Sequence, residues 1–143
     1  MAKAKIFRIE RVTAPVAAVD ASACCRDLDN WPRSWMGLER DVPPGQQLVA
    51  CFRPFLEYLV TSADLSPKTI QKHVDHLWVL GGEIIRDLND NPSLRRKPIE
   101  QLLFDVIDDD GGPLIYGVSS EQQQRSFDST CRKLQRFLGQ TSR

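Results

Sequence analysis

Apolar residues recur at helical spacing through most of the chain after residue 47. A first stripe predicts a helix and consists of Leu48, Phe52, Phe55, Leu56 and Leu59. A second stripe predicts a helix of about five turns and consists of Ile70, Val74, Leu77, Trp78, Gly81, Ile84, Ile85 and Leu88. Ser66 is a good N-cap for this second helix, and Pro67 suits its first position. The two helices are therefore expected to form a pair joined by a short polar turn.

Two later segments predict further helices. Pro98 opens a third helix with apolar residues from Ile99 to Ile107, and the acidic and glycine-rich stretch 108–113 ends it. A fourth helix follows Ser119, which resembles a capping box with Gln122, and ends at Gly139. Its stripe is Phe127, Cys131, Leu134, Phe137 and Leu138. The pattern predicts an all-α fold, a bundle of four main helices.

The first 45 residues carry weaker patterns. Ile6 to Val12 alternates roughly between apolar and charged residues and predicts one short strand or an extended arm. Pro43-Pro44-Gly45 is the clearest helix breaker, so we expect an arm over 1–45 and a helical domain over 46–143. Trp31 and Trp35 favour an arm packed on the core, with a base-stacking aromatic platform as the alternative.

Two features interrupt the predicted helices. Pro54 removes a backbone donor inside the first one, which predicts a kink or a regular part that starts near Arg53. Gly81-Gly82 costs about 1 kcal/mol per glycine relative to alanine inside the second. The expected compensation is close approach of another helix, or a break into two segments.

The formal net charge of the 143 residues is zero, but the charge is unevenly distributed. Residues 98–120 carry a net charge of −5 and residues 121–143 one of +3. A zero total argues against strong non-specific binding of nucleic acid, although local basic faces remain open. No apolar run approaches the roughly 20 residues of a membrane span, and no signal peptide precedes the chain, so we expect a cytoplasmic protein.

Catalytic and metal-binding patterns are weak. His73 and His76 lack further ligands and are expected to face solvent or lie at a rim. Asp108 to Asp110 lacks the spacing of a calcium loop, and the four cysteines lack a zinc-binding pattern. Cys51 and Cys131 fall on apolar stripes and are expected to be buried, inert thiols. We therefore expect no enzymatic activity, no cofactor and no small-molecule substrate.

Two of these segments share motifs with a known family. The first helix reads F-x-x-F-L-x-Y-L over 52–59, and the second opens S-P-K-T-I-x-x-H-x-x-x-L over 66–77. With the short helix after Pro98 and the S-x-x-S-x-x-R-K-L-x-x-F-L segment over 126–138, the chain resembles the core-binding domain of tyrosine recombinases (phage integrases) over about 48–138. Residues 65–73 resemble, more weakly, the recognition helix of response-regulator-type helix-turn-helix proteins.

The recombinase resemblance implies a SAM-like four-helix domain that clamps one side of a DNA duplex. The family's separate catalytic domain has no counterpart in these 143 residues, so strand cleavage is not expected. The hypothesis is a non-catalytic protein that binds double-stranded DNA, as an accessory or remnant of a mobile element. The proposed DNA-binding residues, on the helices that the resemblance places against DNA and in the basic loop between them, are Lys68, Thr69, Gln71, Lys72, Arg95, Arg96, Lys97, Arg132, Lys133 and Arg136.

A protein–protein interaction module with the same fold, including a homodimer, is the competing hypothesis. Its contact candidates are Trp31, Trp35 and Tyr116. Charge segregation distinguishes the two hypotheses. Acidic residues 108–110 beside the basic clusters would favour a protein partner, and a single basic face with the acids behind it would favour DNA.

Overall fold

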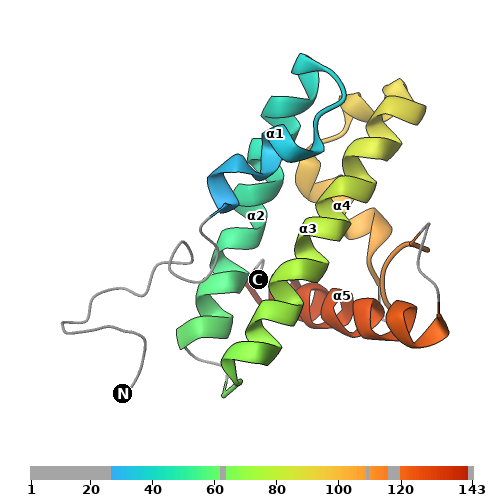
Figure 1. Ribbon diagram of the computed structural model, residues 1–143. Coiled ribbons are helices and arrows are strands. Elements are labelled where there is room, and N and C mark those ends of the chain that lie inside the picture. Colours follow the sequence, from blue (N-terminus) through green and yellow to red (C-terminus); the bar gives the residue numbers. More distant parts are fainter. Residues whose placement is uncertain (1–26, 62–63, 109, 116–119, 142–143) are drawn as a thin grey trace.

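The computed structural model describes residues 27–61, 64–108, 110–115 and 120–141, and Figure 1 shows their arrangement. Its α-helices are α1 (Trp31–Trp35), α2 (Val42–Thr61), α3 (Pro67–Asp90), α4 (Ile99–Val106) and α5 (Glu121–Thr141). Short 3-10 helices are η2 (Leu28–Asn30), η3 (Glu39–Asp41) and η4 (Pro92–Arg96). The described residues form helices and no strand, which confirms the all-α class. The strand expected over 6–12 lies outside them.

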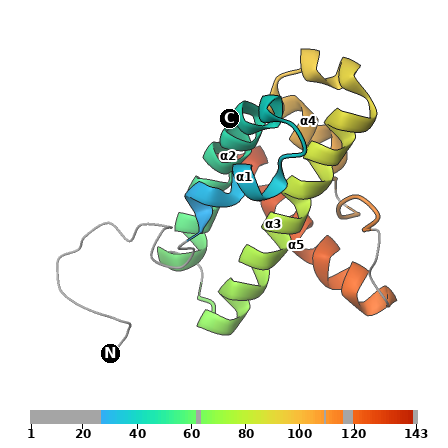
Figure 2. The same ribbon diagram turned by 45° about the horizontal axis from the view of Figure 1, so that its top comes forward.

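Helices α2 and α3 run antiparallel side by side and form the centre of the fold (Figures 1 and 2). Most residues of the two predicted stripes are fully buried, and these include Leu48, Phe52, Phe55, Leu56, Leu77, Ile84 and Leu88. Leu80, which the predicted stripe did not include, is also fully buried. The Ser66 hydroxyl accepts a hydrogen bond from the Thr69 amide at 3.2 Å, which confirms it as the N-cap of α3. Within the described residues, no helix is both long and apolar enough to cross a membrane.

Helix α2 begins at Val42, so the expected break at Pro43-Pro44-Gly45 is wrong. The prolines occupy the first turn, where backbone N–H groups have no partner within the helix and their loss costs little. Gly45 allows α1 to approach closely, since a Cβ there would lie 2.9 Å from the Cα of Pro32. The helix also continues through Pro54 to Thr61.

Helix α3 is continuous across Gly81-Gly82, and the expected close approach of another helix is made there by α1 through the side chain of Trp35. The indole of Trp35 lies against Gly81, and a Cβ at that position would overlap the ring. Trp35 Nε1 donates to the carbonyl oxygen of Trp78 at 2.9 Å, and Trp78 Nε1 donates to Ser34 Oγ at 2.9 Å. These contacts fix α1 against the middle of α3.

Helix α5 crosses the end of the pair where α2 finishes and α3 starts (Figure 1). Its Phe137 ring lies 5.5 Å from Phe55 and 5.3 Å from Tyr58 of α2, centre to centre. Ser120 caps this helix through a 3.1 Å bond from the Gln123 amide, while Ser119 lies outside the described residues. The helix continues past the expected end at Gly139.

Candidate nucleic-acid interface

The ten residues predicted to bind DNA divide into two groups in space. The first group lies on the opening turns of α3 and along α5, and consists of Lys68, Thr69, Gln71, Lys72, Arg132, Lys133 and Arg136. The second group, Arg95 to Lys97, lies in and just after η4, beyond the other end of α3. Since α3 spans roughly 36 Å at 1.5 Å per residue, the two groups occupy opposite ends of the fold.

The first group brings cations from two helices together. Lys72 of α3 and Lys133 of α5 both lie close enough to His73 to lower its pKa. Lys68, Lys72, Lys133 and Arg136 are exposed, and none of them makes an ion pair with another described residue. We call these four residues the α3–α5 basic face.

Arg132 lies at the border between this face and the loop that carries Asp108 and Asp110, which we call the acidic loop. Its Nη1 donates to the backbone carbonyl of Asp110 at 3.3 Å, so the loop adjoins α5 on that side. Gln71 donates to Asp75 at 2.9 Å on α3. The charges are therefore partly segregated, with acidic residues at one edge of the basic face.

The second group is largely engaged within the protein. Arg95 Nη2 lies 2.6 Å from the buried Asp41 carboxylate and 2.8 Å from Asn89 Oδ1. Burial favours the neutral form of Asp41, but bonds from Asn89, Arg95 and two backbone amides outweigh it and hold the pKa well below its usual range. Lys97 is paired with Asp105 at 3.2 Å. Arg95 is thus a structural cation in this fold.

The two histidines share one hydroxyl group, which corrects the expectation for His73. Its side chain is 3% exposed instead of facing solvent, and its Nδ1 lies 2.6 Å from Thr130 Oγ1. His76 is half-buried, and its Nδ1 lies 2.7 Å from the same oxygen. Burial, then Lys133, Lys72 and His76, lowers the pKa of His73 to about 4. His73 is therefore neutral near pH 7.

The histidine, cysteine and acidic side chains of the described residues were candidates for metal binding, and the cysteines for reaction as thiolates. The described residues contain no cluster of three histidine, cysteine or acidic side chains that could hold a metal ion. Burial raises the pKa of Cys131 to about 12, and burial with the nearby Glu100 charge raises that of Cys51 to about 11. Both thiols are therefore protonated at neutral pH and poor nucleophiles.

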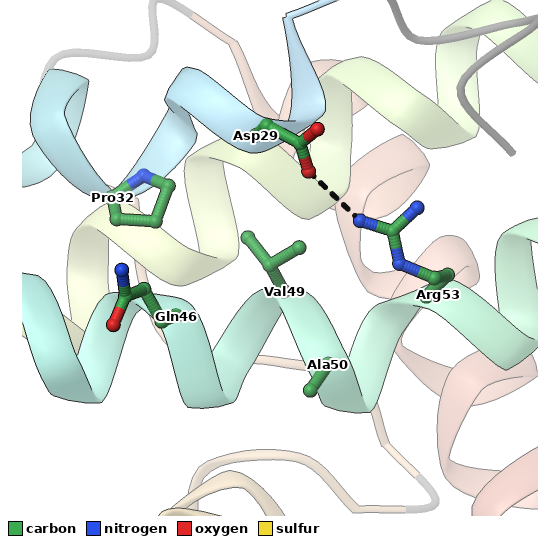
Figure 3. A pocket seen from close by; sticks show the side chains of 6 residues that line it. All are labelled: Asp29, Pro32, Gln46, Val49, Ala50 and Arg53. Atoms are coloured by element: carbon green, nitrogen blue, oxygen red, sulfur yellow. Dashed lines mark hydrogen bonds and ion pairs between the residues drawn. The ribbon is translucent and has the colours of Figure 1, made fainter.

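A surface hollow of about 350 Å³ lies between η2, α1 and α2 (Figure 3). Its lining residues are Asp29, Pro32, Gln46, Val49, Ala50 and Arg53. Arg53 Nη2 is paired with Asp29 Oδ1 at 3.0 Å across this hollow. The hollow lacks a pair of groups suited to acid–base or nucleophilic catalysis, and it does not include the basic face.

Trp31 and Trp35 both pack on the helical core, as expected. Trp31 is 6% exposed, and Trp35 is held against Gly81, so neither is available as a base-stacking platform or as a partner contact. Tyr116 lies outside the described residues. Trp78, which the periodicity placed on the buried stripe, is 43% exposed.

Four polar residues among those described are buried, and the sequence pattern predicted none of them as core residues: Asp41, His73, Glu83 and Thr130. Thr130 lies within the apolar stripe of α5, between Phe127 and Leu134, where a hydroxyl signals a buried partner. His73 lies four residues before the buried Leu77, on the same side of α3. That spacing was a usable signal for a buried histidine.

The chain was compared with known proteins at three levels. No family model, no curated protein and no solved structure matches it. The recombinase resemblance therefore rests on the motifs themselves and stays a prediction.

Proposed function

We propose that this protein is a non-catalytic, cytoplasmic protein that binds double-stranded DNA through the α3–α5 basic face. The observation that carries the proposal is the contact between α3 and α5 at His73, whose Nδ1 lies 2.6 Å from Thr130 Oγ1. This contact brings the helical turns that carry Lys72 and Lys133, 61 positions apart in the sequence, to the same buried histidine. Four exposed cations that have no ion-pair partner among the described residues can neutralise neighbouring phosphates and release their counterions. The resemblance to the core-binding domain of tyrosine recombinases supports the same two helices.

Not all ten predicted residues are available to contact phosphates. Arg95 is committed to Asp41, and Lys97 to Asp105, so their charges are locally compensated. We therefore assign the main phosphate contacts to Lys68, Lys72, Lys133 and Arg136. Thr69, Gln71 and Arg132 border the face, and Arg96 lies at the far end.

Fluorescence anisotropy of a labelled duplex, titrated with the protein at several salt concentrations, tests the proposal. We expect a Kd in the micromolar range at low salt that weakens steeply as salt rises. The double charge reversal Lys72→Glu/Lys133→Glu should abolish binding. Absence of binding by the unmodified protein at low salt would refute the proposal.

Arg96→Glu with Arg40→Glu provides a matched control with the same change in net charge. Both residues are exposed, and a 3.4 Å bond from Arg95 Nη1 to the Arg40 carbonyl places Arg40 beside η4, which carries Arg96 and follows the end of α3. The control should bind DNA within about twofold of the unmodified protein, since surface charges beyond a Debye length are largely screened. Equal losses in the two double variants would show that total charge, and not this face, governs binding.

A protein-binding module is the second candidate, and two observations favour it. The backbone carbonyl of Asp110 accepts a hydrogen bond from Arg132. The apolar side chains of Met36, Leu38 and Trp78 are exposed, and Trp78 lies beside α1 through its bond to Ser34. Its test is sedimentation velocity at increasing protein concentration. A dimer that Trp78→Ser disrupts would support this candidate over DNA binding.

A further inference from the structure

Thr130 connects the two histidines in a hydrogen-bonded chain next to the basic face. Its Oγ1 lies 2.6 Å from His73 Nδ1 and 2.7 Å from His76 Nδ1. A hydroxyl carries a single proton, so between two neutral rings it donates to one Nδ1 and accepts from the Nδ1–H of the other. The two imidazoles therefore hold opposite tautomers.

Burial decides which ring holds which tautomer. The Nε2 of His73 is buried and has no partner among the described residues, whereas the Nε2 of the half-buried His76 is not enclosed in this way. A proton on the buried Nε2 of His73 would be an unsatisfied donor, which is rarer in proteins than an unsatisfied acceptor. His73 therefore donates through Nδ1–H to Thr130, and Thr130 donates to Nδ1 of His76. The remaining proton of His76 is on Nε2, on the open side of the ring.

We propose that His76 donates a hydrogen bond from Nε2–H to a DNA backbone phosphate held on the α3–α5 basic face. This inference rests on the proposed function and adds one contact to it. Lys72 lies one turn before His76 on α3 and acts on its charge, so one phosphate can contact both side chains. The ring is held in place by Thr130 and by an edge-to-face contact with Phe127, at 5.9 Å between centres.

Binding at this position should also take up a proton. The charged groups that act on the two rings are Lys72 and Asp75 of α3 and Lys133 of α5. Burial and Lys72 lower the pKa of His76 in the unbound protein, and Asp75 acts in the opposite direction. A phosphate beside Nε2 favours the imidazolium form, so DNA affinity should rise as the pH falls from about 8 to about 6.

Two measurements on the full chain test the inference. Long-range ¹H–¹⁵N correlation spectra of the imidazoles report the tautomers, expected as Nδ1–H for His73 and Nε2–H for His76. Anisotropy titrations with a duplex compare His76→Phe, which keeps a ring but has no donor, with His76→Gln, whose amide can donate but does not titrate. We expect His76→Phe to weaken binding about five- to tenfold. His76→Gln should stay within about twofold at pH near 8 and lose the pH dependence.

The outcomes separate this inference from the proposed function. Tautomers opposite to those expected would overturn the inference, whatever the DNA affinity. The expected tautomers together with unchanged binding by His76→Phe would also overturn it, and loss of binding in Lys72→Glu/Lys133→Glu would then show that the proposed function stands. No binding by the unmodified protein at low salt would overturn both.

Discussion

Asp41 concentrates more hydrogen bonds than any other carboxylate among the described residues. It is fully buried and accepts bonds from the amides of Gly37 and Leu38 and from the side chains of Asn89 and Arg95. Burying a charge is costly unless it is paired and hydrogen-bonded, and here both conditions are met. The carboxylate thereby joins the segment before α2 to the end of α3.

Replacing this carboxylate should be strongly destabilising. We expect Asp41→Asn to lower the free energy of unfolding by about 3–5 kcal/mol, because Arg95 would lose the anion that compensates its charge. Urea denaturation followed by circular dichroism measures the change. Asp105→Asn, which removes an exposed pair with Lys97, is the matched control and should leave the free energy of unfolding nearly unchanged, because exposed ion pairs contribute little. Equal losses in the two variants would contradict this role of Asp41.

His73 should make the fold sensitive to mild acid. An ordinary histidine has a pKa of 6.5, and burial is the main cause that lowers the pKa of His73 to about 4 in the folded protein. Between these values the unfolded chain binds more protons, so stability is full above about pH 7 and falls as the pH drops. The loss should reach about 3 kcal/mol near pH 4.

The comparison of pH profiles isolates this effect from the carboxylates. His73→Asn keeps an amide near the Nδ1 position and cannot be protonated in this range. Its free energy of unfolding should change less than that of the unmodified protein between about pH 7 and about pH 5. Parallel profiles would show that His73 does not cause the acid sensitivity.

At the scale of elements, Gly81 is the position where α1 docks on α3. Gly81→Ala places a Cβ inside the Trp35 ring, so we expect a loss of about 2–3 kcal/mol in stability despite the better helix propensity. Gly82→Ala is the adjacent control, because its Cβ would lie 3.4 Å from Trp35 in ordinary contact. It should gain about 0.5–1 kcal/mol, and thermal unfolding of both variants checks the difference in sign. Two stabilising substitutions would mean that Trp35 does not pack there.

The long helices could be predicted because each carries its own signal. α3 has an N-cap, a proline at its first position and a stripe that continues to Leu88, and these features depend only on local sequence. The start of α2 could not be predicted in this way. Pro43 and Pro44 are compatible with the first turn of a helix and would break a helix that began earlier. The helix begins at Val42, where α1 and η3 pack against it, and local sequence does not show these contacts.

The candidate site could be predicted only as a set of basic residues. The sequence placed Lys72 and Lys133 on exposed helical faces, but their meeting depends on how α5 crosses α3. The same limitation applies to Arg95, which the sequence predicts as an exposed cation in a loop. Its partner Asp41 lies 54 positions away in the sequence and contacts it only in the folded protein. Long-range ion pairs of this kind leave no local pattern in the sequence.

At the scale of the whole molecule, zero net charge separates the two electrostatic contributions to DNA binding. Long-range attraction between protein and duplex should be weak, since it depends on the total charge distribution. Counterion release depends only on the cations that contact phosphates, and the α3–α5 basic face offers four of them. Binding should therefore be salt-dependent without strong long-range steering.

The slope of the salt dependence should therefore report how many residues of the basic face contact phosphates. With four phosphate contacts, the slope of log K against log salt concentration should be about −3.6, since each contact contributes about −0.9. Lys72→Gln/Lys133→Gln should reduce the magnitude of this slope by about 2, while Arg96→Gln at the far end should leave it unchanged. Anisotropy titrations over about 50–200 mM salt measure all three slopes. A similar reduction by Arg96→Gln would extend the contact surface over both ends of α3 and contradict a single basic face.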